Sequence, residues 1–325
     1  MTGSRRPLLR VVAWPYALAT VAVVVLWSTV GATSLTQWVD LLTFWWSLPA
    51  VALVLVALVA RDRRAAALFA VPAVLWLWAY GTAFLPGEAP AAVPDLRVVS
   101  FNTFVAVEGE EHVLDLVETT EPDVLLLQEV FPPREAALRE RLADRFPHVH
   151  VDQSPGVGGV AVLSRHPIVD TIPVGTPSER SRTTSVVVLD VDGELVQVVS
   201  LHLISPCPTC GTSVVERLEL EDDVRRAEVS ATLEALDPDL PVVVGGDLNS
   251  GERSTAYRQL AAAGFDDPQR RAGSGPGFTW PADRRVPAFL RIDWILTRGL
   301  TPVAAWVAPP HASDHRPVVV DVALP

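Results

Sequence analysis

The 325-residue chain begins with long apolar segments, after which apolar runs alternate with polar ones. Stretches 11–30, 41–60 and 65–85 are almost uncharged and about 20 residues long, enough to cross a hydrocarbon core. We predict three transmembrane helices there. A signal peptide would have one shorter apolar core without two further spans. Buried helices of a soluble domain are disfavoured, because these runs leave few polar positions to face water.

Basic residues indicate the orientation of these spans. Arginines precede the first span and separate the second from the third, whereas the loop between the first two spans contains Asp40 and no basic residue. The arginines are Arg5, Arg6, Arg10, Arg61, Arg63 and Arg64. Because short basic loops stay in the cytoplasm, residues after the third span are expected outside the cell membrane. Residues 86–95 are rich in proline and are predicted to form a short tether.

From residue 96 onward, short apolar runs alternate with amphipathic stretches, which predicts one α/β domain over 96–325. The predicted strands cover 96–102, 123–129, 157–164, 184–190, 195–203, 241–247, 291–297, 301–307 and 317–323. The predicted helices cover 110–119, 133–145, 214–236 and 254–263. This order repeats strands, helix and strands twice.

The charge of this region bears on its substrates. The whole chain has a formal charge of −12 and no lysine, and the residues after 95 hold 20 arginines against 34 acidic residues. Proteins that bind polyanions tightly normally carry a basic surface. The composition therefore argues against tight binding of nucleic acid.

Short polar motifs lie on or beside the apolar runs. They are Ser100-Phe101-Asn102, Leu127-Gln128-Glu129, Ser200-Leu201-His202, Gly246-Asp247-Leu248-Asn249, Arg291-Ile292-Asp293 and Ser313-Asp314-His315. Amides, carboxylates and an Asp-His pair are suited to holding a hard cation, activating water and binding a phosphate. His315 is the best candidate general base, because imidazole titrates near neutrality. Adjacent Ser313, Asp314 and His315 cannot form a serine-hydrolase triad, whose members must lie in a line.

The glycine-rich run before Asp247 has two expected features. On an extended segment, Asp247 and Asn249 would point to the same side, because they are two residues apart. Gly245 and Gly246 would let the backbone approach a ligand closely. The alternative is a turn in which Asp247 caps the backbone.

These six motifs, in this order, resemble the endonuclease/exonuclease/phosphatase superfamily over about residues 96–325. The resemblance implies a DNase I-like, four-layer sandwich: two packed mixed sheets with helices outside. It also implies a Mg²⁺ cofactor, with Mn²⁺ as a substitute. Glu129 would be the principal metal ligand, Asn102 would assist the metal and the phosphate, and Asp314 would face them.

The resemblance also implies roles for the remaining motif residues. Asp247 would position or deprotonate the attacking water, and Asp293 would orient His315. Phosphate contacts would come from Asn102, Asn249, His202 and Arg182. The Tyr or Glu that supports the donor histidine in several members cannot be identified here, so the protonation role of His202 stays open.

Three functions remain from the sequence. The leading one is a membrane-anchored, metal-dependent phosphoesterase acting on a lipid headgroup or small molecule, and the second is an extracytoplasmic nuclease. A non-catalytic binding module is disfavoured because every motif position is filled. No protein partner is indicated. Four further histidines are expected to be ordinary polar surface residues: His148, His150, His166 and His311.

Cys207 and Cys210 are the only cysteines. Two further soft ligands for zinc are missing, and the Pro/Gly-rich loop does not suit a thioredoxin-like redox motif. Outside the cytoplasm, a disulfide that closes a small loop is expected, with free thiols as the alternative.

Overall fold

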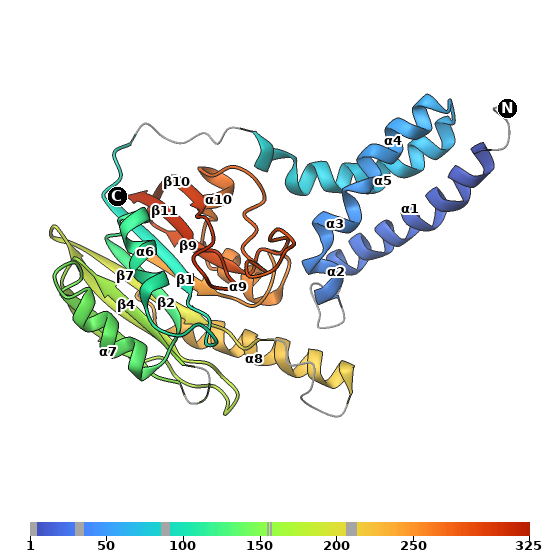
Figure 1. The fold of residues 1–325 in the computed structure, drawn as a ribbon. Helices are drawn as coiled ribbons and strands as arrows, with labels where there is room; N and C mark the ends of the chain where they lie inside the picture. Colours follow the sequence, from blue (N-terminus) through green and yellow to red (C-terminus); the bar gives the residue numbers. More distant parts are fainter. Residues whose placement is uncertain (1–4, 30–35, 86–91, 155, 157, 206–212) are drawn as a thin grey trace. The chain divides into compact units, whose positions relative to one another are not determined.

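The computed structural model describes all residues except 1–4, 30–35, 86–91, 155, 157 and 206–212. It divides into two compact units, Met1–Leu85 and Pro86–Pro325, which are described separately (Figure 1). Cys207 and Cys210 lie outside the described residues, so their disulfide stays a prediction.

The described part of the first unit is helical. Its elements are α1 (Arg5–Thr29), α2 (Gln37–Leu41), α3 (Thr43–Ser47), α4 (Pro49–Val59), α5 (Arg63–Tyr80) and the 3₁₀ helix η1 (Gly81–Phe84). Two segments, Leu8–Thr29 and Arg63–Phe84, are long and apolar enough to cross a membrane. They correspond to the first and third expected spans.

The second expected span, 41–60, is not a single helix. The helix α2 ends at Leu41, and the apolar stretch Thr43–Val59 is divided between α3 and α4. Pro49 begins α4, in agreement with the preference of proline for the first helical turn, where its missing N–H costs nothing. This segment is shorter than the two others, so three membrane-spanning helices are not supported.

An ion pair joins the start of α1 to the start of α5. Arg10 of α1 donates from Nε to Asp62 Oδ2 at 2.8 Å, and Asp62 also caps α5 by accepting from the Ala65 N–H. Buried side chains of α1, α4 and α5 pack beside this pair, with Phe69 fully buried. The start of α1 and the turn between α4 and α5 therefore lie at the same end of this unit.

The second unit contains two sheets. The first has the strands β1 (Leu96–Asn102), β2 (Val124–Val130), β3 (His148–Asp152), β4 (Gly159–Ser164), β10 (Thr301–Val307) and β11 (Val318–Ala323), in the order β10-β11-β1-β2-β4-β3. The second has β5 (Ile168–Ile172), β6 (Thr184–Val191), β7 (Glu194–His202), β8 (Val242–Asp247) and β9 (Asp293–Arg298), in that order. The helices are α6 (Glu111–Thr120), α7 (Pro132–Arg141), α8 (Val214–Ala235), α9 (Thr255–Ala262) and α10 (Pro268–Arg271).

Each sheet contains one parallel pair. These pairs are β1 with β2 and β7 with β8, joined through α6 and through α8 respectively. The other pairings are antiparallel. Because parallel neighbours end at the same edge, each pair brings the carboxyl ends of two strands together. The two halves of the domain therefore repeat one arrangement, as the order of the predicted elements indicated.

Apolar side chains fill three layers of this unit. Buried valines and leucines of both sheets, among them Leu126 and Val198, form the core between the sheets. The helices α6 and α7 cover the outer face of the first sheet, and α8 and α9 cover that of the second (Figure 1). Alternate strand residues face opposite sides, so sheets that are covered on both faces read as nearly continuous apolar runs. The expected two-sheet, DNase I-like sandwich is confirmed.

Candidate active site

Polar side chains meet where the parallel strands end. Asn102 ends β1, His202 ends β7 and Asp247 ends β8, while Glu129 is the penultimate residue of β2. Asp293 begins β9 and lies opposite Asp247 in the antiparallel ladder. The two parallel pairs therefore deliver these groups to one edge of the sandwich.

Asn102 connects the two sheets. Its Nδ2 donates to Asp247 Oδ2 at 3.1 Å and lies 3.3 Å from Glu129 Oε1, and its own Oδ1 accepts the Phe104 N–H at 3.0 Å. Ser313 holds the same residue from the C-terminal loop, since its hydroxyl donates to the Asn102 carbonyl at 2.7 Å. One buried amide thus fixes the carboxylates of β2 and β8 relative to each other.

The backbone at Glu129 is unusual. Its φ of 60° is left-handed, and the pairing of β2 with β4 shifts register there, as in a β-bulge. Gly158 lies so close that an added Cβ would be 2.7 Å from the Glu129 carbonyl carbon. Buried Arg134 donates to the Glu129 carbonyl at 3.3 Å and to Thr103 Oγ1 at 2.6 Å. A bulge can redirect a side chain at the end of a strand, so these contacts hold the Glu129 carboxylate at the site.

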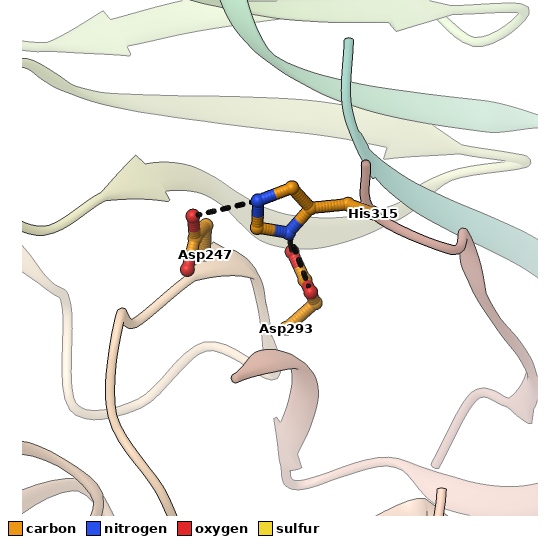
Figure 2. Close-up of side chains that lie close together, drawn as sticks. All are labelled: Asp247, Asp293 and His315. Atoms are coloured by element: carbon orange, nitrogen blue, oxygen red, sulfur yellow. Dashed lines mark hydrogen bonds and ion pairs between the residues drawn. The ribbon is translucent and has the colours of Figure 1, made fainter. Parts of the chain in front are cut away.

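Figure 2 shows His315 between two aspartates. His315 Nδ1 lies 2.9 Å from both carboxylate oxygens of Asp293, and its Nε2 lies 3.8 Å from Asp247 Oδ2. Asp293 therefore fixes the imidazole with Nδ1 protonated and Nε2 directed to the other carboxylate. This arrangement orients a base, because the remaining nitrogen is free to exchange a proton with water or substrate.

Burial and charge act in opposite directions on the pKa of His315. Burial alone lowers it, but the carboxylates of Asp293, Asp247 and Asp314 raise the pKa of His315 to about 10. Burial and the nearby Asp293 charge also raise the pKa of Asp247. Crowded carboxylates disfavour their own ionisation unless a cation shares the site. The excess of negative charge is therefore a physical reason for a cation to bind here.

His202 occupies a different electrostatic environment. Its Nε2 lies 3.8 Å from Asp247 Oδ2 and 4.0 Å from Glu129 Oε1. Burial, followed by the charges of Arg182 and His315, lowers the pKa of His202 to about 3. The imidazole is therefore neutral near pH 7 and can act as a hydrogen-bond donor, but not as a strong acid.

Asp314 has one carboxylate oxygen without a hydrogen bond. Its Oδ2 accepts from Trp280 Nε1 at 3.2 Å, whereas its buried Oδ1 makes no hydrogen bond among the described residues. That oxygen lies 3.8 Å from His315 Nε2. A buried carboxylate oxygen without a hydrogen bond suits a cation that prefers oxygen ligands.

One group of the described side chains is arranged so that it could hold a cation. Asp247, Asp293 and His315 have ligand atoms within 4.8 Å of one another. However, His315 Nδ1 and Asp293 already share a hydrogen bond, and Mg²⁺ prefers oxygen ligands. Glu129 and Asp314 offer carboxylate oxygens, whereas Asn102 turns its Nδ2 to the cluster and its Oδ1 to the Phe104 N–H.

The segment after Asp247 differs from the sequence-based expectation. Asn249 has a left-handed φ of 49°, its N–H donates to Asp247 Oδ1 at 2.7 Å, and its Nδ2 donates to the Leu203 carbonyl at 3.0 Å. The chain therefore turns here and does not continue as an extended segment. These two hydrogen bonds of Asn249 hold Asp247 and the end of β7 in place.

The two glycines of β8 serve packing within the fold. A Cβ on Gly245 would lie 2.5 Å from Leu126 Cδ1 of the facing sheet, and one on Gly246 would lie 1.8 Å from the Leu201 carbonyl oxygen. Packing accounts for both glycines, and the close approach of a ligand to this backbone stays a prediction. The glycines allow close approach between the sheets and between β7 and β8.

Arg182 lies beside the site and is held by α8. Its backbone N–H donates to Glu228 Oε1 at 2.5 Å, and its Nη2 donates to Ser205 Oγ at 3.2 Å. Burial lowers the pKa of Arg182, while the charges of Glu129, Glu228 and Asp247 raise it. Its guanidinium therefore lies in the electrostatic field of the carboxylate cluster, as a phosphate-contacting arginine requires.

The interpretation of His311 as a surface residue was wrong. This side chain is buried, and its Nδ1 lies 2.8 Å from Asp115 Oδ2 of α6. It tethers the loop that carries Asp314 and His315. Sequence reasoning also missed Arg134, Glu228 and Trp280. Glu228 and Trp280 lie far along the chain from Arg182 and Asp314, which they contact, and the position of Arg134 five residues after Glu129 is only a weak signal.

The sequence matches one family model. The model of the Endonuclease/Exonuclease/phosphatase family matches residues 99–315, a range that includes every residue of the cluster. No curated protein gave a significant match.

Solved structures resemble the second unit. A protein described as endonuclease/exonuclease/phosphatase from Beutenbergia cavernae is 25% identical, with a TM-score of 0.57 over 71% of this chain and 72% of that one. D. rerio TDP2 complexed with a single-strand DNA product is 16% identical, with a TM-score of 0.53 over 70% and 98%. Beta toxin from Staphylococcus aureus is 18% identical, with a TM-score of 0.52 over 71% and 100%. The last two likenesses concern the fold alone.

Proposed function

The chain belongs to the endonuclease/exonuclease/phosphatase family, whose members typically hydrolyse phosphoester bonds, and from this premise we propose a metal-dependent phosphoesterase. The observation that carries the proposal is the Asp293–His315–Asp247 arrangement beside Glu129 and Asn102. It unites an oriented base with carboxylates that can bind a cation.

The metal site of the proposal consists of Glu129, Asn102 and Asp314. The carboxylate oxygens of Glu129 and Asp314 suit Mg²⁺ or Mn²⁺, and the buried Asp314 Oδ1 lacks a hydrogen bond among the described residues. Asn102 would turn its Oδ1 from the Phe104 N–H to the ion. The bound cation would supply positive charge to the phosphoryl group of the substrate. The same charge would lower the raised pKa of His315, which brings its base form nearer to neutral pH.

The other residues act on water and phosphate. In the proposed reaction, His315 Nε2 takes a proton from the attacking water, Asp293 keeps the imidazole oriented, and Asp247 positions the water. Neutral His202, Asn249 and Asn102 donate hydrogen bonds to phosphoryl oxygens. Arg182 contributes a positive charge. Donors that are fixed before the reaction stabilise the charge that develops as the bond breaks.

The substrate is proposed to be a small phosphoester or a lipid headgroup. A domain with 34 acidic residues against 20 arginines after residue 95 offers little support for binding a long polyanion. Nucleic acid could still be cut, because the site acts locally, so a nuclease is the second candidate. Weak affinity for DNA with a strong dependence on salt is expected.

Turnover of small esters and DNA can be compared directly. At about 150 mM salt, kcat/KM for bis(4-nitrophenyl) phosphate should equal or exceed that for duplex DNA, because salt screens the few phosphate contacts. A preference of about a hundredfold or more for DNA or RNA would make the nuclease the primary function. Failure to cleave any phosphoester would refute the proposed activity.

The helical unit is proposed to anchor the enzyme in the cell membrane, with the catalytic domain outside the cytoplasm. Two helices have the necessary length and apolarity, and the shorter apolar segment Thr43–Val59 would have to return the chain across the bilayer between them. The pairing of Arg10 with Asp62 places the basic start of α1 and the basic α4–α5 turn at one end, which suits the cytoplasmic side.

A fusion experiment tests this anchor and its orientation. Alkaline phosphatase fused after Pro325 should be active, because this reporter matures outside the cytoplasm, and the protein should stay with membranes in alkaline carbonate. A matched fusion after Arg63 should be inactive. Release by carbonate would contradict the anchor, and the reverse reporter pattern would contradict the orientation.

A further inference from the structure

A hollow of about 530 Å³ lies beside the candidate active site. Its walls come from the end of β3, the segment 171–177 between β5 and β6, the residues that lead into β6, and Glu228 of α8. The volume falls in the range of small-molecule sites. None of the roles assigned above occupies this space.

Arg182 connects the hollow to the carboxylate cluster. It lines the hollow together with Thr184, which pairs with Leu201, the residue before His202 at the end of β7. Its backbone is fixed by Glu228, whose second carboxylate oxygen accepts the Ile204 N–H at 3.2 Å. A phosphate ester held by Arg182 at the active site could therefore extend its organic group into the hollow.

The lining is rich in hydrogen-bonding groups. Asp152 accepts from Ser185 Oγ at 2.5 Å and lies 2.9 Å from His150 Nε2, which leaves further acceptor capacity on its half-exposed carboxylate. Threonine hydroxyls add both donors and acceptors: Thr171, Thr176, Thr183 and Thr184. Groups that both donate and accept hydrogen bonds match the hydroxyls of a sugar or polyol.

The same lining disfavours other organic groups. No Phe, Tyr or Trp is among the described residues that line the hollow, so neither a nucleobase nor a quaternary ammonium has an aromatic surface to bind. Among the described lining residues Arg182 is the single arginine, against Asp152 and Glu228. A second phosphate would meet unfavourable charge.

We propose that this hollow binds a neutral, hydroxyl-rich group, a sugar or polyol, of the phosphodiester whose phosphate lies at Arg182 and His315. This inference rests on the proposed phosphoesterase function and defines its substrate class. The shared chemistry is a polyol phosphodiester, present either in a soluble molecule or as the headgroup of a lipid.

Substitutions that fill the hollow, or that remove one of its hydroxyl groups, test the inference in the full-length protein. Gly175 lines it and does not have a left-handed φ, and a Cβ added there meets no atom within 4 Å, so Gly175→Trp can be accommodated. Val169→Trp is the matched control, because Val169 is exposed on neighbouring β5 and does not line the hollow. Thr171→Val removes one lining hydroxyl with little change in volume.

The substrates are glycerophosphoinositol, which carries a polyol, and bis(4-nitrophenyl) phosphate, which carries none. Gly175→Trp should raise KM for glycerophosphoinositol about tenfold or more, and Thr171→Val should raise it about threefold, because lost polar contacts weaken binding. KM for bis(4-nitrophenyl) phosphate should stay within about twofold in every variant, as should both KM values of Val169→Trp.

The outcomes separate this inference from the proposed function. If wild-type protein cleaves bis(4-nitrophenyl) phosphate but prefers glycerophosphocholine or a dinucleotide to glycerophosphoinositol, the polyol site is refuted. Equal effects of Gly175→Trp on both test substrates also refute it. Absence of all hydrolysis refutes the phosphoesterase itself; binding of myo-inositol 1-phosphate that Gly175→Trp abolishes would still support the polyol site. Comparison with phosphatidylinositol vesicles distinguishes a lipid source from a soluble one.

Discussion

Glu129→Gln should lower kcat for phosphoester hydrolysis by at least about a hundredfold while the protein stays folded. The substitution keeps the size of the side chain and its ability to accept the Val105 N–H, a bond of 2.6 Å in the structure. It removes the negative charge that the proposed cation needs. The measurement is the initial rate at saturating Mg²⁺, together with the thermal unfolding midpoint.

Glu118→Gln is the matched control for this prediction. Glu118 is exposed on α6, so the same change of charge occurs away from the site. The control should keep wild-type kcat within about twofold, as surface substitutions usually have small effects. Wild-type turnover by Glu129→Gln would remove this residue from the metal site.

His315→Ala should also lower kcat by at least about a hundredfold, since a positioned base commonly contributes that much. Asp293→Asn should cause a similar loss, because the new amide can direct an N–H at His315 Nδ1, where the structure has an acceptor at 2.9 Å. The proton of the His315 imidazole would then move from Nδ1 to Nε2, and Nε2 could not accept a proton from water. Both variants are assayed across pH, with circular dichroism to check the fold.

His166→Ala is the control for the histidine variant. His166 follows β4, outside the cluster, and its loss should leave kcat within about twofold. If His315→Ala kept full activity, proton transfer would have to come from another group. If only Asp293→Asn stayed active, His315 would act without the orientation that we assign to Asp293.

The sequence predicted the central strands well because they are buried on both faces. β1, β2 and β8 read as apolar runs, and the polar residue at the end of each run marks the edge of the sheet. Asn102, Glu129 and Asp247 could therefore be identified as residues of one site, whereas His315 was identified from the Asp-His pair that precedes β11. The edge strands β3 and β5 were missed, since most of their positions are only partly buried and their composition is mixed.

Contacts between distant segments could not be predicted. The left-handed backbone of Glu129 depends on the tight approach of Gly158 and on Arg134, neither of which local propensity specifies. His311 looked like a surface residue because its partner, Asp115, lies far away in the chain. Nor did composition reveal that the apolar segment 41–60 is divided into short helices. Tertiary structure determines all of these features.

Removal and return of metal tests the central claim most directly. Full-length protein in detergent is stripped with EDTA, dialysed, and assayed for hydrolysis of bis(4-nitrophenyl) phosphate before and after addition of Mg²⁺ or Mn²⁺. We predict that the stripped wild-type protein is inactive and that either ion restores its activity, whereas Glu129→Gln stays at least about a hundredfold slower at the same ion concentration. Hydrolysis at the full rate by the stripped protein, unchanged when the ions are added, would contradict the account.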